Sequence, residues 1–267
     1  MYSRIGGKSP IFDITMAQAH ALERALNASL PMSRDSHPFR VSVGMRYWHP
    51  FIEEALAKMY HDGIKNIIGI SLYPHYSLAT AGSAVSRFTD ALAQYPMESF
   101  CVSSWYDHPL YIEALVETIR KGLHSFHGAS GEVLFSAHSL PMRIVESGDP
   151  YVSHIRGTID AVAQRIDISW HLSYQSRSGP VRWLGPSTED TLKSLAARGV
   201  RDLLIVPISF VSDHIETLYE IDIVYKEHAK QLGMNLVRAE SLNTSPLFIK
   251  TLEDIVVKTY KELGWNG

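Results

Sequence analysis

One histidine and a series of carboxylates are the side chains of this sequence best suited to handling a metal ion and protons. His138 ends the apolar run 133–137. Glu216 and Glu220 lie four residues apart, downstream of a second apolar run. On a regular α-helix this spacing puts both carboxylates on one side, with Glu227 on the same side two turns further on. An imidazole that faces such carboxylates suits the binding of a divalent cation and the transfer of protons to and from it.

Two buried parallel strands are expected to position these side chains. Residues 133–137 and 203–210 are largely apolar without alternation, as in strands that helices cover on both faces. In open α/β sheets, ligands bind at the carboxyl ends of the strands. We therefore expect His138, Glu216 and Glu220 to meet at that edge of the sheet.

A repeated pattern predicts an α/β fold with two Rossmann-like halves, each a parallel sheet flanked by helices, and a cleft between them. Residues 62–72 and 198–210 both read as a helix end, a glycine turn and a buried strand. A stretch rich in glycine and serine at 124–131 predicts a connector between the halves. The first half is expected to comprise residues 1–129 and 246–267, and the second residues 130–245.

Hydrophobic periodicity and turn residues predict the other elements. Strands are expected at residues 40–46, 67–72, 99–103, 133–138, 170–176 and 203–210. Helices are expected after a cap at Thr15, at residues 51–59, 110–123 and 152–166, from residue 187 onward, and at residues 246–263. His49, His75 and His108 each stand beside a proline in a turn, where a surface position is expected.

The composition of the 267 residues excludes several classes of protein. An apolar fraction of 45% with 20% charged residues supports buried cores and argues against disorder. The formal net charge of −3 gives no reason to expect nucleic acid as a partner. The single cysteine, Cys101, rules out an internal disulfide and any four-thiolate metal site within one chain. With no apolar run of the ~20 residues that span a bilayer and no signal-peptide pattern, a cytoplasmic location is expected.

Ordinary structural roles are the alternative for each candidate side chain. Glu216 follows Asp213 by three residues, so it fits a helix capping box as well as a catalytic site. A single histidine at a strand end, such as His138, is more often a buried side chain with satisfied hydrogen bonds than a metal ligand. The further structural alternatives are a helix cap for His214, core packing for Trp183 and an ion pair for Arg46.

The segment around His138 resembles the signature of the ferrochelatase family. This signature is long and specific: it covers residues 134–141 and continues through Gly148-Asp149-Pro150-Tyr151. The resemblance extends over nearly the whole chain, through residues 4–10, 44–47, 73–77, 183–186, 212–222 and 239–243.

The resemblance implies a lyase of haem biosynthesis that inserts ferrous iron into protoporphyrin IX and releases two protons. His138 and Glu216 correspond to the facing histidine and glutamate assigned to iron binding and proton removal, and Glu220 continues an acidic path. The residues expected to line the macrocycle cleft are Met45, Arg46, Tyr47, Tyr73, Tyr76 and Trp183. Porphyrin and ferrous iron are the implied partners, both as substrates. No permanently bound cofactor and no iron–sulfur cluster are expected.

The sequence departs from the family pattern in two further respects. The third acid that many relatives carry along the helix is Val224 here, and Asp222 and Glu227 are the nearest carboxylates. The family usually opens with a strand and a helix before the segment 4–10, and the sequence is expected to lack them. The alternatives are a chelatase for coproporphyrin III or for cobalt, and a non-catalytic protein that binds porphyrin or metal. Oligomeric state and peripheral membrane contact stay open.

Overall fold

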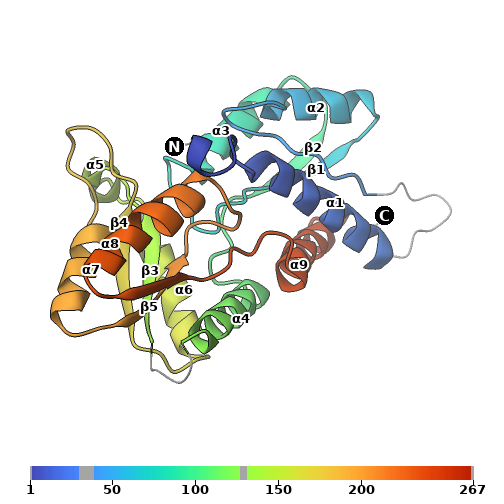
Figure 1. Cartoon of the computed structure of the whole chain (residues 1–267). Helices are drawn as coiled ribbons and strands as arrows, with labels where there is room; N and C mark the ends of the chain where they lie inside the picture. Colours follow the sequence, from blue (N-terminus) through green and yellow to red (C-terminus); the bar gives the residue numbers. More distant parts are fainter. Residues whose placement is uncertain (1, 30–38, 127–130, 266–267) are drawn as a thin grey trace.

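The structure is a computed structural model that describes residues 2–29, 39–126 and 131–265 (Figure 1). The strands are β1 (Asn66–Ile70), β2 (Glu98–Val102), β3 (Glu132–His138), β4 (Trp170–Gln175), β5 (Asp202–Pro207) and β6 (Asn235–Arg238). The helices are η1 (Tyr2–Arg4), α1 (Ile11–Ser29), α2 (Ile52–His61), α3 (Ala81–Leu92), α4 (Pro109–His124), α5 (Met142–Glu146), α6 (Tyr151–Ala163), α7 (Thr188–Ala197), the π-helix η2 (Glu216–Tyr225), α8 (Lys226–Gln231) and α9 (Pro246–Glu262).

A four-stranded parallel sheet with the order β4-β3-β5-β6 positions the candidate site. Alternate residues of its strands pack into two separate cores, one on each face. Phe135 and Val206 lie in the core that includes residues of α4 and α6. Leu134 and Ile205 lie in the core that includes residues of α7, η2 and α8. Because both faces are covered, the strands read as continuous apolar runs in the sequence.

A smaller parallel sheet pairs β1 with β2. α2 and α3 contribute to a separate apolar core, in which Ile52 and Leu56 of α2 pack with Ile67 of β1. α1 and α9 lie side by side, and α9 also packs against α4 and β1 (Figure 1). Across the described residues, no helix combines the length and the apolar character that crossing a bilayer requires.

The predicted α/β architecture of parallel sheets flanked by helices is confirmed, but several local predictions are wrong, two of them about secondary structure. Residues 40–46 form no strand, because their backbone N–H groups donate to side chains and loop carbonyls and not to a neighbouring strand. The Val41 N–H, for example, donates to the Glu23 carboxylate at 2.8 Å. Thr15 caps no helix, because α1 begins at Ile11 and the Thr15 hydroxyl donates to the Ile11 carbonyl at 2.7 Å.

His75 is buried, contrary to the surface position expected from the adjacent proline. Only 1% of the residue is exposed. Its Nε2 lies 2.9 Å from Thr158 Oγ1, and this hydroxyl donates to the Tyr106 carbonyl at 2.6 Å. Since the hydroxyl hydrogen is used there, the imidazole Nε2–H must be the donor to Thr158. The loop after β1 is thus docked onto α6.

The division into halves stays a prediction. The boundary expected near residue 129 falls on residues 127–130, which lie outside the described residues. α4, expected in the first half, packs against α9 and also against β5 and α6. Both sheets therefore share helices through a common region of the core.

Candidate active site

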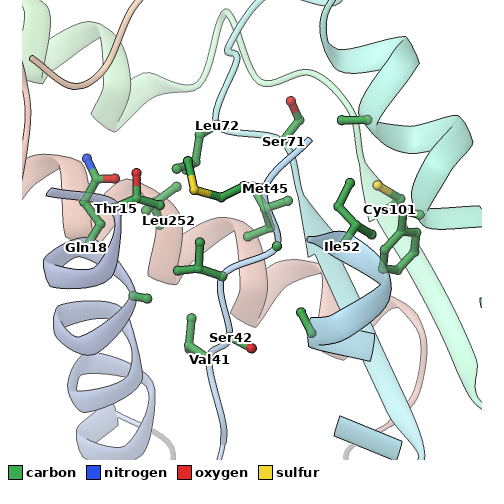
Figure 2. A pocket seen from close by; sticks show the side chains of 18 of the residues that line it. Thr15, Gln18, Val41, Ser42, Met45, Ile52, Ser71, Leu72, Cys101 and Leu252 are labelled. Carbon is green, nitrogen blue, oxygen red and sulfur yellow. The ribbon is translucent and has the colours of Figure 1, made fainter. Parts of the chain in front are cut away.

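A cavity of about 1540 Å³ runs along the whole of β1, between α1, α2, α9 and the segment 41–45, and reaches His138 at the carboxyl end of β3. Figure 2 shows side chains that line it, among them Gln18 of α1, Met45, Ile52 of α2 and Leu252 of α9. The lining is mostly apolar, and its ionisable side chains include His138, His214, Glu216 and Arg46. A large, mostly apolar cavity with a few polar groups is typical of a site for a large organic ligand.

His138 ends β3 with its imidazole held in one orientation. The backbone N–H of His138 donates to Ser209 Oγ at 2.7 Å, which ties the end of β3 to the loop after β5. The imidazole Nδ1 lies 2.8 Å from the Ser139 carbonyl oxygen, so Nδ1 is the protonated nitrogen of the pair. A neutral imidazole in this tautomer keeps the lone pair of Nε2 free to bind a metal ion or a proton.

Glu216 lies beside a second, more deeply buried histidine. His214 Nε2 is 3.2 Å from Glu216 Oε2 but completes no hydrogen bond, and only 8% of the His214 side chain is exposed. The Nδ1–H of His214 donates to the Ser212 carbonyl oxygen at 2.9 Å. Burial lowers the pKa of His214, although Glu216 acts in the opposite direction. The neutral imidazole thus directs an unpartnered Nε2 lone pair toward the Glu216 carboxylate. Because both atoms can accept a proton, one proton could be shared between them.

Phe210 lies between the two histidines. Its ring centroid is 4.1 Å from that of His214 and 6.0 Å from that of His138. All three side chains belong to residues that line the large cavity, together with Glu216. The structure therefore brings His138 and Glu216 to the same cavity, as predicted from the sequence.

The expectation that Glu216 and Glu220 meet at one edge of the sheet is wrong. They lie on η2, a π-helix, where four residues are close to one full turn as on an α-helix, so the surrounding elements and not the helix form alone separate the two carboxylates. Glu216 lines the large cavity, whereas Glu220 lines a second cavity of about 390 Å³ with Val224 and Tyr225. The two carboxylates open onto different spaces.

Glu220 is held by donors from the end of β4. Ser176 Oγ donates to Glu220 Oε2 at 2.6 Å, and Gln175 Nε2 donates to the same oxygen at 3.1 Å. Ser176 adopts φ of 64°, a left-handed conformation that is uncommon for a residue other than glycine. A residue in this backbone conformation is held there by its surroundings, and for Ser176 these include the hydrogen bond to Glu220.

The capping-box alternative for Glu216 is also wrong. In a capping box the glutamate would accept the N–H of Asp213, but that N–H donates to Asn243 Oδ1 at 2.9 Å. The carboxylate of Glu216 is turned toward His214 instead. Glu216 is therefore free of a capping role.

Four of the six predicted cleft residues line the large cavity: Met45, Arg46, Tyr47 and Tyr73. Partial burial raises the pKa of Tyr73, of which 42% is still exposed, and the nearby Glu216 raises it further. Arg46 forms no ion pair in the described structure; its Nε donates to Ser83 Oγ at 3.0 Å, and its guanidinium lies 4.9 Å from the centre of the Tyr47 ring.

Tyr76 and Trp183 lie outside the lining of the large cavity. The Tyr76 phenol packs so closely on the start of α3 that a Cβ at Gly82 would come within 2.8 Å of its hydroxyl. Trp183 forms an isolated bridge with Pro141, and its indole N–H is buried without a partner. Their roles toward a ligand stay predictions.

Sequence reasoning missed the position of His214 beside Glu216 and offered only a helix cap for it. The available signal was its position two residues before Glu216 in a segment that follows a buried strand. Within the described residues, no three His, Cys, Asp or Glu side chains are grouped to hold a metal ion. Side chains in the cavity lining that could donate to a metal ion at this edge of the sheet include the His138 Nε2, the His214 Nε2 and the Glu216 carboxylate.

Similarity to known proteins agrees with this geometry. The sequence model of a protein family described as Ferrochelatase matches residues 1–260. Ferrochelatase of Geotalea uraniireducens is 51% identical over 263 residues, which cover 97% of this chain and 80% of that protein. Ferrochelatase of Geobacter metallireducens is 51% identical over 262 residues, covering 96% and 80%.

A solved structure adds a similarity of fold. SirB from Bacillus subtilis, solved with Fe³⁺, has a TM-score of 0.63 and 13% sequence identity, over 93% of this chain and 91% of that chain. At this identity the similarity concerns the fold alone. The fold is thus shared with a protein that binds metal, while the sequence similarity lies with the curated relatives.

Proposed function

The chain belongs to the ferrochelatase family and is an enzyme that inserts iron into a porphyrin, and on that premise we propose that it converts protoporphyrin IX to haem. The observation that carries the assignment of residues is the position of His138, His214 and Glu216 on one large, mostly apolar cavity. Porphyrin and ferrous iron enter as substrates, and two pyrrole protons leave.

His138 is proposed as the residue that meets the incoming iron. Its Nδ1–H is taken by the Ser139 carbonyl, so Nε2 is available as a neutral nitrogen ligand, which suits Fe²⁺. The hydrogen bond from the His138 N–H to Ser209 and that from the Tyr151 hydroxyl to the His138 carbonyl (3.0 Å) fix the strand end that carries the ring. Such support from neighbouring groups orients a ligand for binding.

Glu216 is proposed to share iron binding and to accept the protons displaced from the pyrrole nitrogens. The unpartnered His214 Nε2 at 3.2 Å from its carboxylate supports this role. A proton that reaches the pair is held between the His214 imidazole and the Glu216 carboxylate. The change in charge is then shared by the two groups. His214 therefore joins the proposed catalytic residues.

Glu220 is proposed to act on protons at the second cavity. Its hydrogen bonds from Ser176 and Gln175 hold the carboxylate in one orientation there. Val224, also in that lining, supplies no further acid. The acidic path expected along the helix is thus divided between two cavities.

Met45, Arg46, Tyr47 and Tyr73 are proposed to form the macrocycle wall on the evidence of their position, with Tyr76 and Trp183 as more distant members. The aromatic and apolar character of the lining suits a flat ring system, and Arg46 suits a carboxylate substituent. We also propose that no cofactor is permanently bound and that the protein works in the cytoplasm. Metal analysis of the purified protein and cell fractionation test these two points.

The test of the substrate is iron insertion measured anaerobically with the purified chain, using protoporphyrin IX and coproporphyrin III side by side. A higher kcat/KM for protoporphyrin IX is the expected result. Preference for coproporphyrin III would assign the more carboxylated substrate, and faster insertion of Co²⁺ than of Fe²⁺ would assign cobalt. Porphyrin binding without insertion of any metal would contradict catalysis.

A further inference from the structure

Arg238, at the end of β6, binds two aspartates with one guanidinium. Its Nε and Nη2 donate to the two oxygens of Asp222, each at 2.9 Å, and its Nη1 donates to Asp213 Oδ1 at 2.9 Å. The Arg238 side chain is only 14% exposed and that of Asp213 21%. A bidentate, largely buried contact of this kind fixes both distance and orientation.

Asp213 is anchored from several sides. Ser241 Oγ donates to its Oδ1 at 2.8 Å, and Asn243 Nδ2 donates to its Oδ2 at 2.9 Å. Burial alone would raise the pKa of Asp213, but the hydrogen bonds and the charge of Arg238 outweigh it and keep that pKa low. The carboxylate is therefore ionised and fully engaged by its neighbours.

The two aspartates lie on either side of the catalytic carboxylate along the chain. Asp213 stands just before η2, Asp222 stands within it, and Glu216 and Glu220 lie between them. A π-helix of this length is rare and gains less from its own hydrogen bonds than an α-helix would. Contacts from outside the helix are needed to favour it. Arg238 supplies them from a strand of the rigid sheet, at the start and the middle of the helix.

We propose that Arg238 is a positioning residue for metal insertion. It holds η2 in its π conformation, which keeps Glu216 against His214 in the large cavity and Glu220 against Ser176 in the second. The inference rests on the proposed roles of these carboxylates. Met45, Tyr47 and Tyr73 come from elements that Arg238 does not contact, so binding of the macrocycle is expected to be independent of it.

Kinetics of Arg238→Met and Arg238→Lys test this proposal. Arg238→Met is expected to lower kcat between about tenfold and a hundredfold, as for other small misplacements of catalytic groups. The KM for porphyrin is expected to stay within a factor of two. Arg238→Lys should recover part of the loss, because one ammonium holds one carboxylate well but cannot bind both as the fork does. A raised KM with unchanged kcat, or wild-type kinetics of Arg238→Met, would overturn the proposal.

Arg165→Met is the matched control, since it breaks an arginine–carboxylate contact far from η2, with Glu113 at 3.4 Å. It should leave kcat and KM within a factor of two. If Arg238→Met fails to fold, Asp222→Asn takes its place, because it keeps the shape of the carboxylate and weakens the same contact. A smaller loss of kcat at unchanged porphyrin KM is then expected, and no loss would contradict the inference.

Hydrogen exchange separates this inference from the proposed function. In Arg238→Lys, amide exchange is expected to accelerate at residues 213–225 and to stay unchanged in β3 and β5. This readout needs no iron insertion, so it holds even if the chain were inactive with every porphyrin. Unchanged exchange at residues 213–225 would reject the positioning role, whereas altered exchange in an inactive protein would reject only the assigned roles of the carboxylates.

Discussion

His214 Nε2 and Glu216 Oε2 lie 3.2 Å apart, and the histidine is the more buried member, with 8% of its side chain exposed against 31% for the glutamate. The pair spans the boundary between the protein interior and the cavity. On the proposed function, a proton taken from a ligand in the cavity would reach the carboxylate first and the imidazole behind it. This order is consistent with Glu216 as the proposed acceptor and His214 as its support.

Removing the His138 ring should abolish iron insertion. His138→Ala loses the proposed nitrogen ligand while leaving the apolar cavity intact, so insertion should fall to the level of the reaction without enzyme. Quenching of porphyrin fluorescence should still show binding near the wild-type affinity. His20→Ala, at an exposed position on α1, is the control and should keep full activity. Retained insertion in His138→Ala would contradict the assignment.

Glu216→Gln keeps the shape of the side chain and removes its ability to hold a proton. We expect kcat to fall at least about 100-fold, because the amide can neither accept the pyrrole proton nor share one with His214. Anaerobic stopped-flow absorbance measures the insertion step. Glu240→Gln removes an exposed carboxylate that pairs with Lys121, and it should have no effect. A loss of less than threefold in Glu216→Gln would argue against the proton role.

Ser176 should act only through Glu220. Glu220→Gln is expected to lower kcat by about tenfold and Ser176→Ala by about threefold, since the second removes one hydrogen bond to a charged group. If the serine works through the glutamate, the double variant should resemble Glu220→Gln alone. Losses that multiply in the double variant would show two independent effects.

Stability should fall in acid because of His75. Burial lowers the pKa of His75 to about 3, against 6.5 for an exposed histidine. Between these values the unfolded chain binds a proton that the folded chain rejects, so the free energy of unfolding drops as the pH falls from 6.5 toward 3, by up to about 1.4 kcal/mol per pH unit. Urea unfolding at several pH values measures it. His75→Gln should flatten this dependence, and an equally steep curve would contradict it.

Gly122 should tolerate no side chain, because α4 packs directly on β5 there. A Cβ at this position would collide with the methyl groups of Leu204, which is fully buried. Gly122→Ala should therefore destabilise the protein by about 1–3 kcal/mol, despite the better helix propensity of alanine. Thermal unfolding tests this. Adding Gly122→Ala to Leu204→Ala should cost nothing, because the colliding methyl groups are gone, and a further loss would place the cause elsewhere.

The sequence predicted elements well where local pattern and tertiary setting agree. β3 and β5 were recognisable because burial on both faces leaves continuous apolar runs. Residues 40–46 alternate like a strand, but a strand also needs neighbours that pair with its backbone, and the alternation carries no information about them. The same holds for His75, whose burial depends on α6, far along the chain.

At the site, the sequence indicated which residue types take part, but it did not indicate how they are arranged in space. His138 and Glu216 do reach one cavity, as their positions after two adjacent strands indicated. The separation of Glu216 from Glu220 was hidden, because spacing along one helix carries no information about the cavities that the surrounding elements form. The position of His214 was hidden for a similar reason, since its burial beside Glu216 depends on the tertiary structure.

The pairing of α1 with α9 also bears on how the chain is made. α9 is translated after every other described element, yet Leu252 and Val256 share a core with Leu22 and Leu26 of α1. The ribosome adds about 5–20 residues per second, so the apolar stripe of α1 waits many seconds for this partner. Until α9 has been made, the residues of α1 that face it lack the apolar cover that they have in the folded protein.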